Sequence, residues 1–288
     1  MKNNFLYLLP IVLFLNSCAT LDTIIVRGTS GVLSKGEKII FSETDYEKAK
    51  IAIPENISLL ETFLESDPQN EQILLLLSQA YTGYALGFVE DENVERAKSL
   101  YKKGRDYGLR ILMKNKNFAD SWNSDEKEFY SAVKMFSRED VPALFWSANA
   151  WGNLINISID DPNELVDLYK VNAMMEAVLE KDENYFFGSA HLYFGTIKAT
   201  TPKILGGDED GAKIHFEKSL KIGNRKFLLP FYFYAKSYAV QTQNKELFEN
   251  LLNEVINAPT DILPEQSLIN IIAKKKSENL LKKINELF

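Results

Sequence analysis

The chain has 288 residues, of which 45% are hydrophobic and 25% charged, and this ordinary globular composition excludes a disordered or collagen-like protein. The low contents of glycine (14) and proline (9) favour helices over an all-β sandwich, which needs more turn residues. A net charge of −7 without a long basic run argues against a nucleic-acid-binding surface. One cysteine and two histidines exclude an internal disulfide, a cysteine-based zinc site and a histidine-rich metal centre, so we expect no metal and no cofactor.

The N-terminus has the form of a bacterial lipoprotein signal peptide. Lys2 precedes an apolar run over residues 5–15, which is shorter than the roughly 20 residues that span a bilayer and has the size of a secretory hydrophobic segment. The only cysteine follows in Leu15-Asn16-Ser17-Cys18. This segment resembles a lipobox, although Asn16 departs from the usual small or aliphatic residue.

These features predict a signal peptide over residues 1–17, lipidation of Cys18, and an anchor and tether over residues 18–42. A short, weakly ordered first helix is the alternative for residues 19–36. Two or three acyl chains anchor a protein durably where one does not. Ala19 after the cysteine resembles the sorting pattern of outer-membrane lipoproteins. We therefore expect a periplasmic protein, held on the inner leaflet of the outer membrane, with membrane contact through the lipid anchor only. The alternative is a signal peptide cleaved elsewhere, with Cys18 uninvolved.

From residue 43 the hydrophobic pattern is helical, and signals for helix starts and ends recur along it. The first signals are a cap at Thr44 for a helix that meets Pro54, and a break in the next helix at Asp67-Pro68. A capping-box pattern follows at Ser137-x-x-Asp140. Further along, Asp161 caps a helix that starts with Pro162, and Asp208 caps a helix that ends near Gly223. No segment alternates convincingly at a period of two. The pattern predicts an all-α fold of roughly ten to twelve helices in one domain, residues 43–288.

Two sets of side chains indicate how helices meet their surroundings. The pairs Gly83-x-x-x-Gly87 and Gly104-x-x-x-Gly108 predict close packing between helices. The last helical segment, residues 264–288, carries lysines at 274–276 and 282–283, which we expect to form a solvated face.

An internal repeat underlies this domain. Residues 60–67 reappear as residues 175–182, and each copy is followed by two helices with a small residue three or four positions before a ring. This resembles the tetratricopeptide pattern, in which helical hairpins pack through small residues. Here the small residues of a hairpin lie 19 and 24 residues apart, at 78 and 97 and at 188 and 212, so we expect extended turns. The positions expected to pack between the repeat helices are Ser78, Tyr81, Ala97, Gly188, His191, Ala212 and Phe216.

Several segments together resemble the T-component family of TRAP transporters, the periplasmic lipoproteins called TatT. They are the lipoprotein start, the helical hairpins, Phe145–Gly152 after Pro142, Gly188–Gly195, and Gly206-Gly207-Asp208 before Ala212–Phe216. The resemblance implies an all-helical repeat protein that forms a homotrimer with one hydrophobic channel per protomer. It also implies association with a TRAP-type periplasmic solute-binding protein and an accessory role in the uptake of a hydrophobic or amphipathic solute.

No pattern indicates catalysis. The sequence Asp208-Glu209-Asp210 does not continue as a calcium loop, no nucleotide-binding glycine motif occurs, and no pair of carboxylates stands out. A lone histidine such as His191 is expected to be a core residue with one satisfied nitrogen. We therefore expect no enzyme; the alternative function is a tetratricopeptide scaffold for cell-envelope protein assembly, which would have a groove lined by lysine, asparagine and arginine.

The segment 144–156 is the best candidate for a ligand site. At helical spacing, Trp146, Asn149 and Asn153 share a face that differs from the fully apolar face around Trp151. Asparagine is a mediocre helix former, and two amides beside a ring suit a partly wet lining. We expect Trp146, Asn149 and Asn153, with Tyr193, to line an apolar cavity for a solute with a hydrocarbon body and a carboxylate. The alternative is that the asparagines face solvent or cap a neighbouring helix.

Overall fold

The computed structural model describes residues 23–288 apart from 25, 159 and 160, and these residues form an all-α fold without strands, as expected. They contain 15 α-helices. Three of these helices, α9, α13 and α16, have five residues or fewer, so the expected ten to twelve helices correspond to the twelve longer ones. The predicted signal peptide and Cys18 lie outside the described residues.

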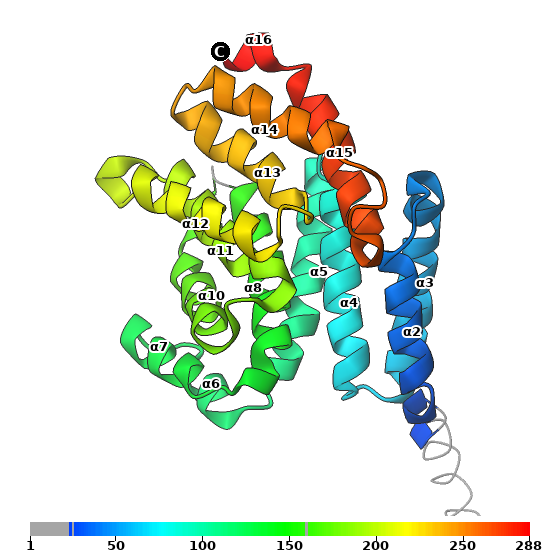
Figure 1. Cartoon of the computed structure of the whole chain (residues 1–288). Coiled ribbons are helices and arrows are strands. Elements are labelled where there is room, and N and C mark those ends of the chain that lie inside the picture. Colours follow the sequence, from blue (N-terminus) through cyan, green and yellow to red (C-terminus); the bar gives the residue numbers. More distant parts are fainter. Residues whose placement is uncertain (1–22, 25, 159–160) are drawn as a thin grey trace, which may run out of the picture.

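The helices follow one another with short connections (Figure 1). Their bounds are α2 (Ser30–Phe41), α3 (Tyr46–Ser66), α4 (Glu71–Tyr84), α5 (Val94–Leu112), α6 (Lys116–Ser121), α7 (Glu126–Lys134), α8 (Val141–Asn156), α9 (Pro162–Leu165), α10 (Leu168–Asp182), α11 (Tyr185–Thr200), α12 (Glu209–Ile222), α13 (Leu229–Phe233), α14 (Lys245–Asn257), α15 (Ser267–Leu281) and α16 (Ile284–Leu287). Two π-helical turns, η1 (Ala85–Val89) and η4 (Tyr234–Ala239), continue α4 and α13, and three 3-10 turns are η2 (Arg138–Asp140), η3 (Lys203–Leu205) and η5 (Pro264–Gln266).

Packing between helices that are close in the sequence builds the core. Helix α4 packs on α5, α5 on α8, α8 on α10, and α11 on α12. The C-terminal helix α15 returns to contact α2 and α3 near the start of the described chain (Figure 1). This return joins the first and last parts of the described chain, with α2 and α3 beside α4 (Figure 1).

The turns within the hairpins differ from the expectation. Helix α4 continues through η1 to Val89, and α5 already starts at Val94. The expectation of an extended turn between positions 78 and 97 is therefore wrong. The additional residues lengthen the first helix of the hairpin and not its turn. In the second hairpin, α11 likewise runs to Thr200, and only residues 201–208 separate it from α12.

Local capping signals are confirmed at several helix starts. Asp161 accepts from the backbone N–H of Asn163, Asp208 accepts from that of Gly211, and the capping box between Ser137 and Asp140 is present. Each cap forms within three residues, so the sequence alone determines it.

The first long helix starts and ends elsewhere than expected. Asp45, and not Thr44, is the cap, and α3 runs through Pro54 as far as Ser66. An interior proline costs about 3 kcal/mol. The buried side chains Ile53, Ile57 and Leu64 continue past it on one face, so packing maintains the helix.

The expectation of a solvated lysine face is wrong for Lys276. Its ammonium is buried and pairs with Asp91 at 2.7 Å. Beside this pair, the buried Glu90 accepts a hydrogen bond from the Tyr101 hydroxyl at 2.6 Å. The Lys276–Asp91 pair joins α15 to the turn between η1 and α5. The two residues are 185 positions apart, so the spacing of the lysines could not reveal this partner.

Within the described part of the chain, one segment is long and apolar enough to span a membrane. Residues Glu71–Val89, α4 with η1, have a mean hydropathy of 1.2 over an 18-residue window, and 61% of that window is buried within the fold. Helix α4 packs against α3, α5 and α8. Its apolar character is therefore that of a central core helix.

All seven residues that were expected to pack between repeat helices are buried. Gly104 and Gly108 of α5 confirm the expected close packing: a Cβ at Gly104 would lie 2.7 Å from the Thr82 hydroxyl, and one at Gly108 would meet the Ser147 hydroxyl. The small residues bring three helix backbones together at one crossing. Gly83 behaves differently, because a Cβ there would have no heavy atom within 4 Å.

Candidate functional site

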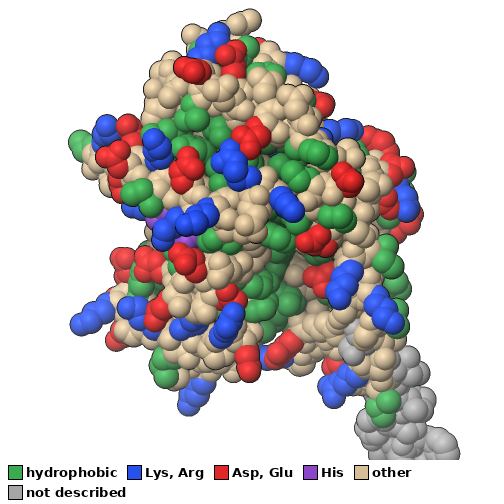
Figure 2. Space-filling model, in the orientation of Figure 1, with side chains coloured by type: hydrophobic (Ala, Val, Ile, Leu, Met, Phe, Trp, Pro, Cys, Tyr) green, Lys and Arg blue, Asp and Glu red, His purple; other side chains and the backbone are tan. Residues whose placement is uncertain are grey.

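An apolar cavity lies between the N-terminal layer and the core. It has a volume of about 370 Å³. Helices α2 and α3 form one wall, α4 with η1 forms the facing wall, and residues of α8, α11, α13 and α15 complete it. Val32 and Leu59 on its wall are 68% and 49% exposed, so they mark its open side. In the view of Figure 2 the molecule is hollowed near its middle, and hydrophobic side chains lie in the hollow.

Each wall follows from the pattern of its helix. On α2, the lining residues Val32, Gly36 and Ile40 recur every four positions, which places them on one helix face. On α4, Leu76, Ala80 and Gly83 recur at spacings of four and three. The absent side chain of Gly83 keeps space open on the α4 side. Hydrophobic pockets of this kind take small molecules with an apolar body.

Phe186 lines the cavity and has a strained backbone conformation. Its φ is 44°, and Phe187 and Gly188 follow at 58° and 71°. Non-glycine residues rarely adopt this left-handed region, and a protein keeps them there only when the surroundings hold them. The Phe186 ring packs edge-on against Trp146 with centroids 4.8 Å apart. This turn at the start of α11 thus holds a ring against the cavity.

The polar groups of the cavity are few. Among the described residues that line it, Glu37 is the only charged one, and Gln79, Asn56 and Asn149 supply amides. Burial raises the pKa of the Glu37 carboxyl, while a hydrogen bond from Gln79 and the charge of Lys38 oppose the rise. The Gln79 Oε1 atom is buried and has no hydrogen-bond partner among the described residues.

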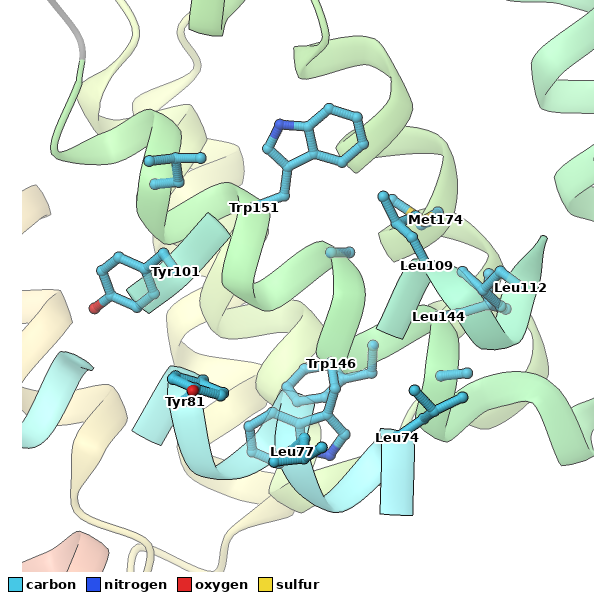
Figure 3. Packing of buried hydrophobic residues seen from close by; sticks show 14 of the residues in the cluster. Leu74, Leu77, Tyr81, Tyr101, Leu109, Leu112, Leu144, Trp146, Trp151 and Met174 are labelled. Atoms are coloured by element: carbon cyan, nitrogen blue, oxygen red, sulfur yellow. The ribbon is translucent and has the colours of Figure 1, made fainter. Parts of the chain in front are cut away.

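The structure brings two of the four predicted lining residues to this cavity. Trp146 and Asn149 are on its wall. The indole N–H of Trp146 donates to the Tyr185 hydroxyl at 3.2 Å, and burial raises the pKa of Tyr185 to about 12. Figure 3 shows Trp146 and Trp151 on opposite sides of α8, which agrees with the two faces expected from the sequence.

The other two predicted residues lie off the wall. The Asn153 amide donates to Asn149 Oδ1 at 3.4 Å. The Tyr193 hydroxyl donates to Asn172 Oδ1 at 2.7 Å, and its ring packs against Gly152. Asn153 therefore orients a lining amide, and Tyr193 packs between α8 and α10.

Sequence reasoning missed the residues of the N-terminal layer and of α4. Glu37 falls within the range expected to be anchor and tether, Gln79 was not considered, and Gly83 was assigned to helix packing. The signal for α2 was present in the four-residue spacing of Val32, Gly36 and Ile40. Nothing in the spacing connects Glu37 with Gln79, because 42 residues separate them in the chain.

The two histidines form a separate pair between α11 and α12. His191 is buried as expected, but both of its nitrogens are engaged: Nε2 lies 2.8 Å from Glu183 Oε1, and Nδ1 lies 2.8 Å from His215 Nδ1. Burial lowers the pKa of both rings, to about 4 for His215. With Nε2–H donated to Glu183, His191 accepts at Nδ1 and His215 donates. No group of three or more metal-ligating side chains occurs in the described part of the chain, and the pair serves to link the two helices.

Comparison with known proteins gives one family. A family model described as TRAP transporter T-component matches residues 42–288. A comparison with curated proteins finds no match. The matched range includes α3 through α16 and thus most of the cavity wall, whereas α2 precedes it.

Proposed function

Because the chain belongs to the TRAP transporter T-component family, an accessory part of these transport systems, we propose that it binds a hydrophobic or amphipathic small molecule in the cavity. In this proposal it cooperates with a TRAP-type periplasmic solute-binding protein and carries out no covalent chemistry. The cavity is the observation that supports the proposal. Its wall consists mainly of aliphatic and aromatic side chains, and each methylene group moved into such a wall contributes about 0.8 kcal/mol.

The composition of the wall favours this function over an assembly scaffold. A groove for extended peptides was expected to present lysine, asparagine and arginine. Among the described residues that line the cavity, none is lysine or arginine, and the two asparagines are Asn56 and Asn149. A hydrocarbon body suits this lining better than a peptide backbone, whose polar groups need partners.

Native mass spectrometry of a soluble form that begins after Cys18 tests the proposal. We expect a small molecule to be retained after gentle purification, or a neutral apolar dye such as N-phenyl-1-naphthylamine to be taken up with one molecule per chain. The same spectrum reports the number of subunits, for which we propose a homotrimer. A protein that carries no ligand and takes up no dye would contradict the binding proposal, and a monomer at all concentrations would contradict the trimer.

Lipid anchoring at Cys18 is part of the same proposal. Residues 1–17 act as the signal peptide, residues 18–42 include the anchor, and residues 43–288 form the helical domain. The anchor holds the protein on the periplasmic side, at the inner leaflet of the outer membrane, within reach of its partner.

Replacing Cys18 with alanine is expected to abolish labelling by a fatty-acid analogue and to release the protein from the membrane fraction, because no other residue supplies the thiol. Ser17→Ala keeps a small residue at the cleavage position and serves as the matched control. If Cys18→Ala remains in the membrane fraction like wild type, the anchor lies elsewhere.

A further inference from the structure

The polar end of the cavity offers hydrogen-bond acceptors in excess of donors. Glu37 projects from α2 and Gln79 from α4, on facing walls. The Gln79 amide N–H₂ donates to the Glu37 carboxylate, which leaves the carboxylate oxygens and the buried Gln79 Oε1 as acceptors. An amide oxygen that is buried without a partner is costly, so this site gains from a group that donates to it.

The charge at this end of the cavity also has no counterpart on the wall. Among the described residues, no lysine or arginine lines the cavity, and the neighbouring Lys38 is exposed. Burial opposes ionisation of Glu37 and raises its pKa. Glu37 is half-buried, and a carboxylate removed in part from water is stabilised when a cation pairs with it and satisfies its lone pairs.

We propose that the cavity selects amphipathic ligands whose polar end is a hydrogen-bond donor with a positive charge, a primary amine above all, and that Glu37 and Gln79 recognise this end. The inference rests on the proposed function and identifies the class of molecule that the cavity takes. The ammonium lies between the Glu37 carboxylate and Gln79 Oε1, and the hydrocarbon body lies among the apolar side chains of α2, α3 and α4.

This assignment differs from the carboxylate expected from Asn149 and Asn153. Asn149 does retain N–H donors, since Asn153 contacts its oxygen. These donors are neutral, so they offer a ligand carboxylate hydrogen bonds but no opposite charge, whereas an ammonium beside Glu37 gains both. A ligand carboxylate would also enter the cavity beside the like charge of Glu37, which disfavours it.

Competition between three ligands of equal chain length tests the inference. Decylamine, decanol and decanoate each displace N-phenyl-1-naphthylamine from the soluble form at pH 7. We expect decylamine to displace the dye at a concentration about tenfold lower than decanoate, with decanol between them, as a charge-assisted hydrogen bond predicts. Glu37→Gln retains the shape of the side chain and removes its charge. In Glu37→Gln, the concentrations of decylamine and decanoate that displace the dye are expected to differ by no more than about threefold.

Two further variants complete the test. Glu55→Gln removes an exposed carboxylate from α3 that does not line the cavity, and it is expected to retain the wild-type preference. Gln79→Leu removes the free oxygen while leaving Glu37, and it is expected to reduce the preference for the amine in part. Circular dichroism confirms that each variant is folded.

The outcomes separate this inference from the proposed function. Equal displacement by all three compounds, or a preference for decanoate, would overturn the recognition by Glu37 and Gln79 while the cavity remains the binding site. A preference for the amine that persists in Glu37→Gln would also overturn it. Absence of dye binding to the wild-type protein would instead contradict the proposed function.

Discussion

Replacing Gly83 with phenylalanine is expected to block the cavity and to weaken binding of N-phenyl-1-naphthylamine by roughly a hundredfold, which corresponds to about 2.7 kcal/mol. Gly83 lines the cavity, and a Cβ at this position has no heavy atom within 4 Å. The new ring therefore enters open space and occupies the volume that the ligand needs. Fluorescence titration of the dye measures the loss directly.

The fold is expected to tolerate this replacement. Glycine inside a helix is less favourable than most other residues by several tenths of a kcal/mol, so the phenylalanine variant retains its helical circular dichroism. Gly83→Ala is the matched control. It is expected to bind the dye like wild type and to gain about 0.5–1 kcal/mol in the free energy of unfolding. Dye binding that is unchanged in Gly83→Phe would mean that the dye binds elsewhere.

Replacing Gly108 with leucine is expected to lower the free energy of unfolding by about 3 kcal/mol or more. Gly108 lies where α5 crosses α4 and α8. A Cβ there would meet the Ser147 hydroxyl and would lie 3.1 Å from both Ser147 Cβ and Ser78 Oγ. Both serines are fully buried, so the helices have to separate to admit the larger side chain. Urea denaturation followed by circular dichroism measures the change.

Gly31→Leu provides the control for the size of the substitution. Gly31 is an exposed glycine of α2, does not line the cavity, and has no heavy atom within 4 Å of a Cβ. Because leucine favours a helix more than glycine does, its replacement is expected to raise the free energy of unfolding by up to about 1 kcal/mol and not to lower it. If Gly108→Leu unfolds at the wild-type urea concentration, the close approach of the three helices does not contribute to stability as we infer.

Much of the fold was predictable because the relevant interactions are local. The caps at Asp161 and Asp208 bond to a backbone N–H two or three residues away, and the capping box at Ser137 also forms within three residues. The two faces of α8 follow from helical periodicity, and Trp146 and Asn149 indeed lie on the cavity wall.

The errors share a physical cause. At Pro54 the local rule predicted an end to the helix, and burial of the apolar face of α3 outweighed the lost hydrogen bond. At Lys276 the run of lysines indicated solvent, yet the side chain is buried and pairs with Asp91, which is 185 residues away in the chain. In both cases contacts with other helices stabilise the observed structure. The spacing of residues within one segment does not show these contacts.

The sequence by itself determined the all-α class, the positions of several helix starts and the family, because helix propensity, capping and residue motifs are properties of short segments. The cavity was decided by the tertiary structure alone. Its walls come from α2, α3, α4, α8, α11, α13 and α15, and the return of α15 onto α2 and α3 places them around one space. The pairing of Glu37 with Gln79, and the open space beside Gly83, exist only because these helices meet, since a contact between distant residues depends on how whole helices pack.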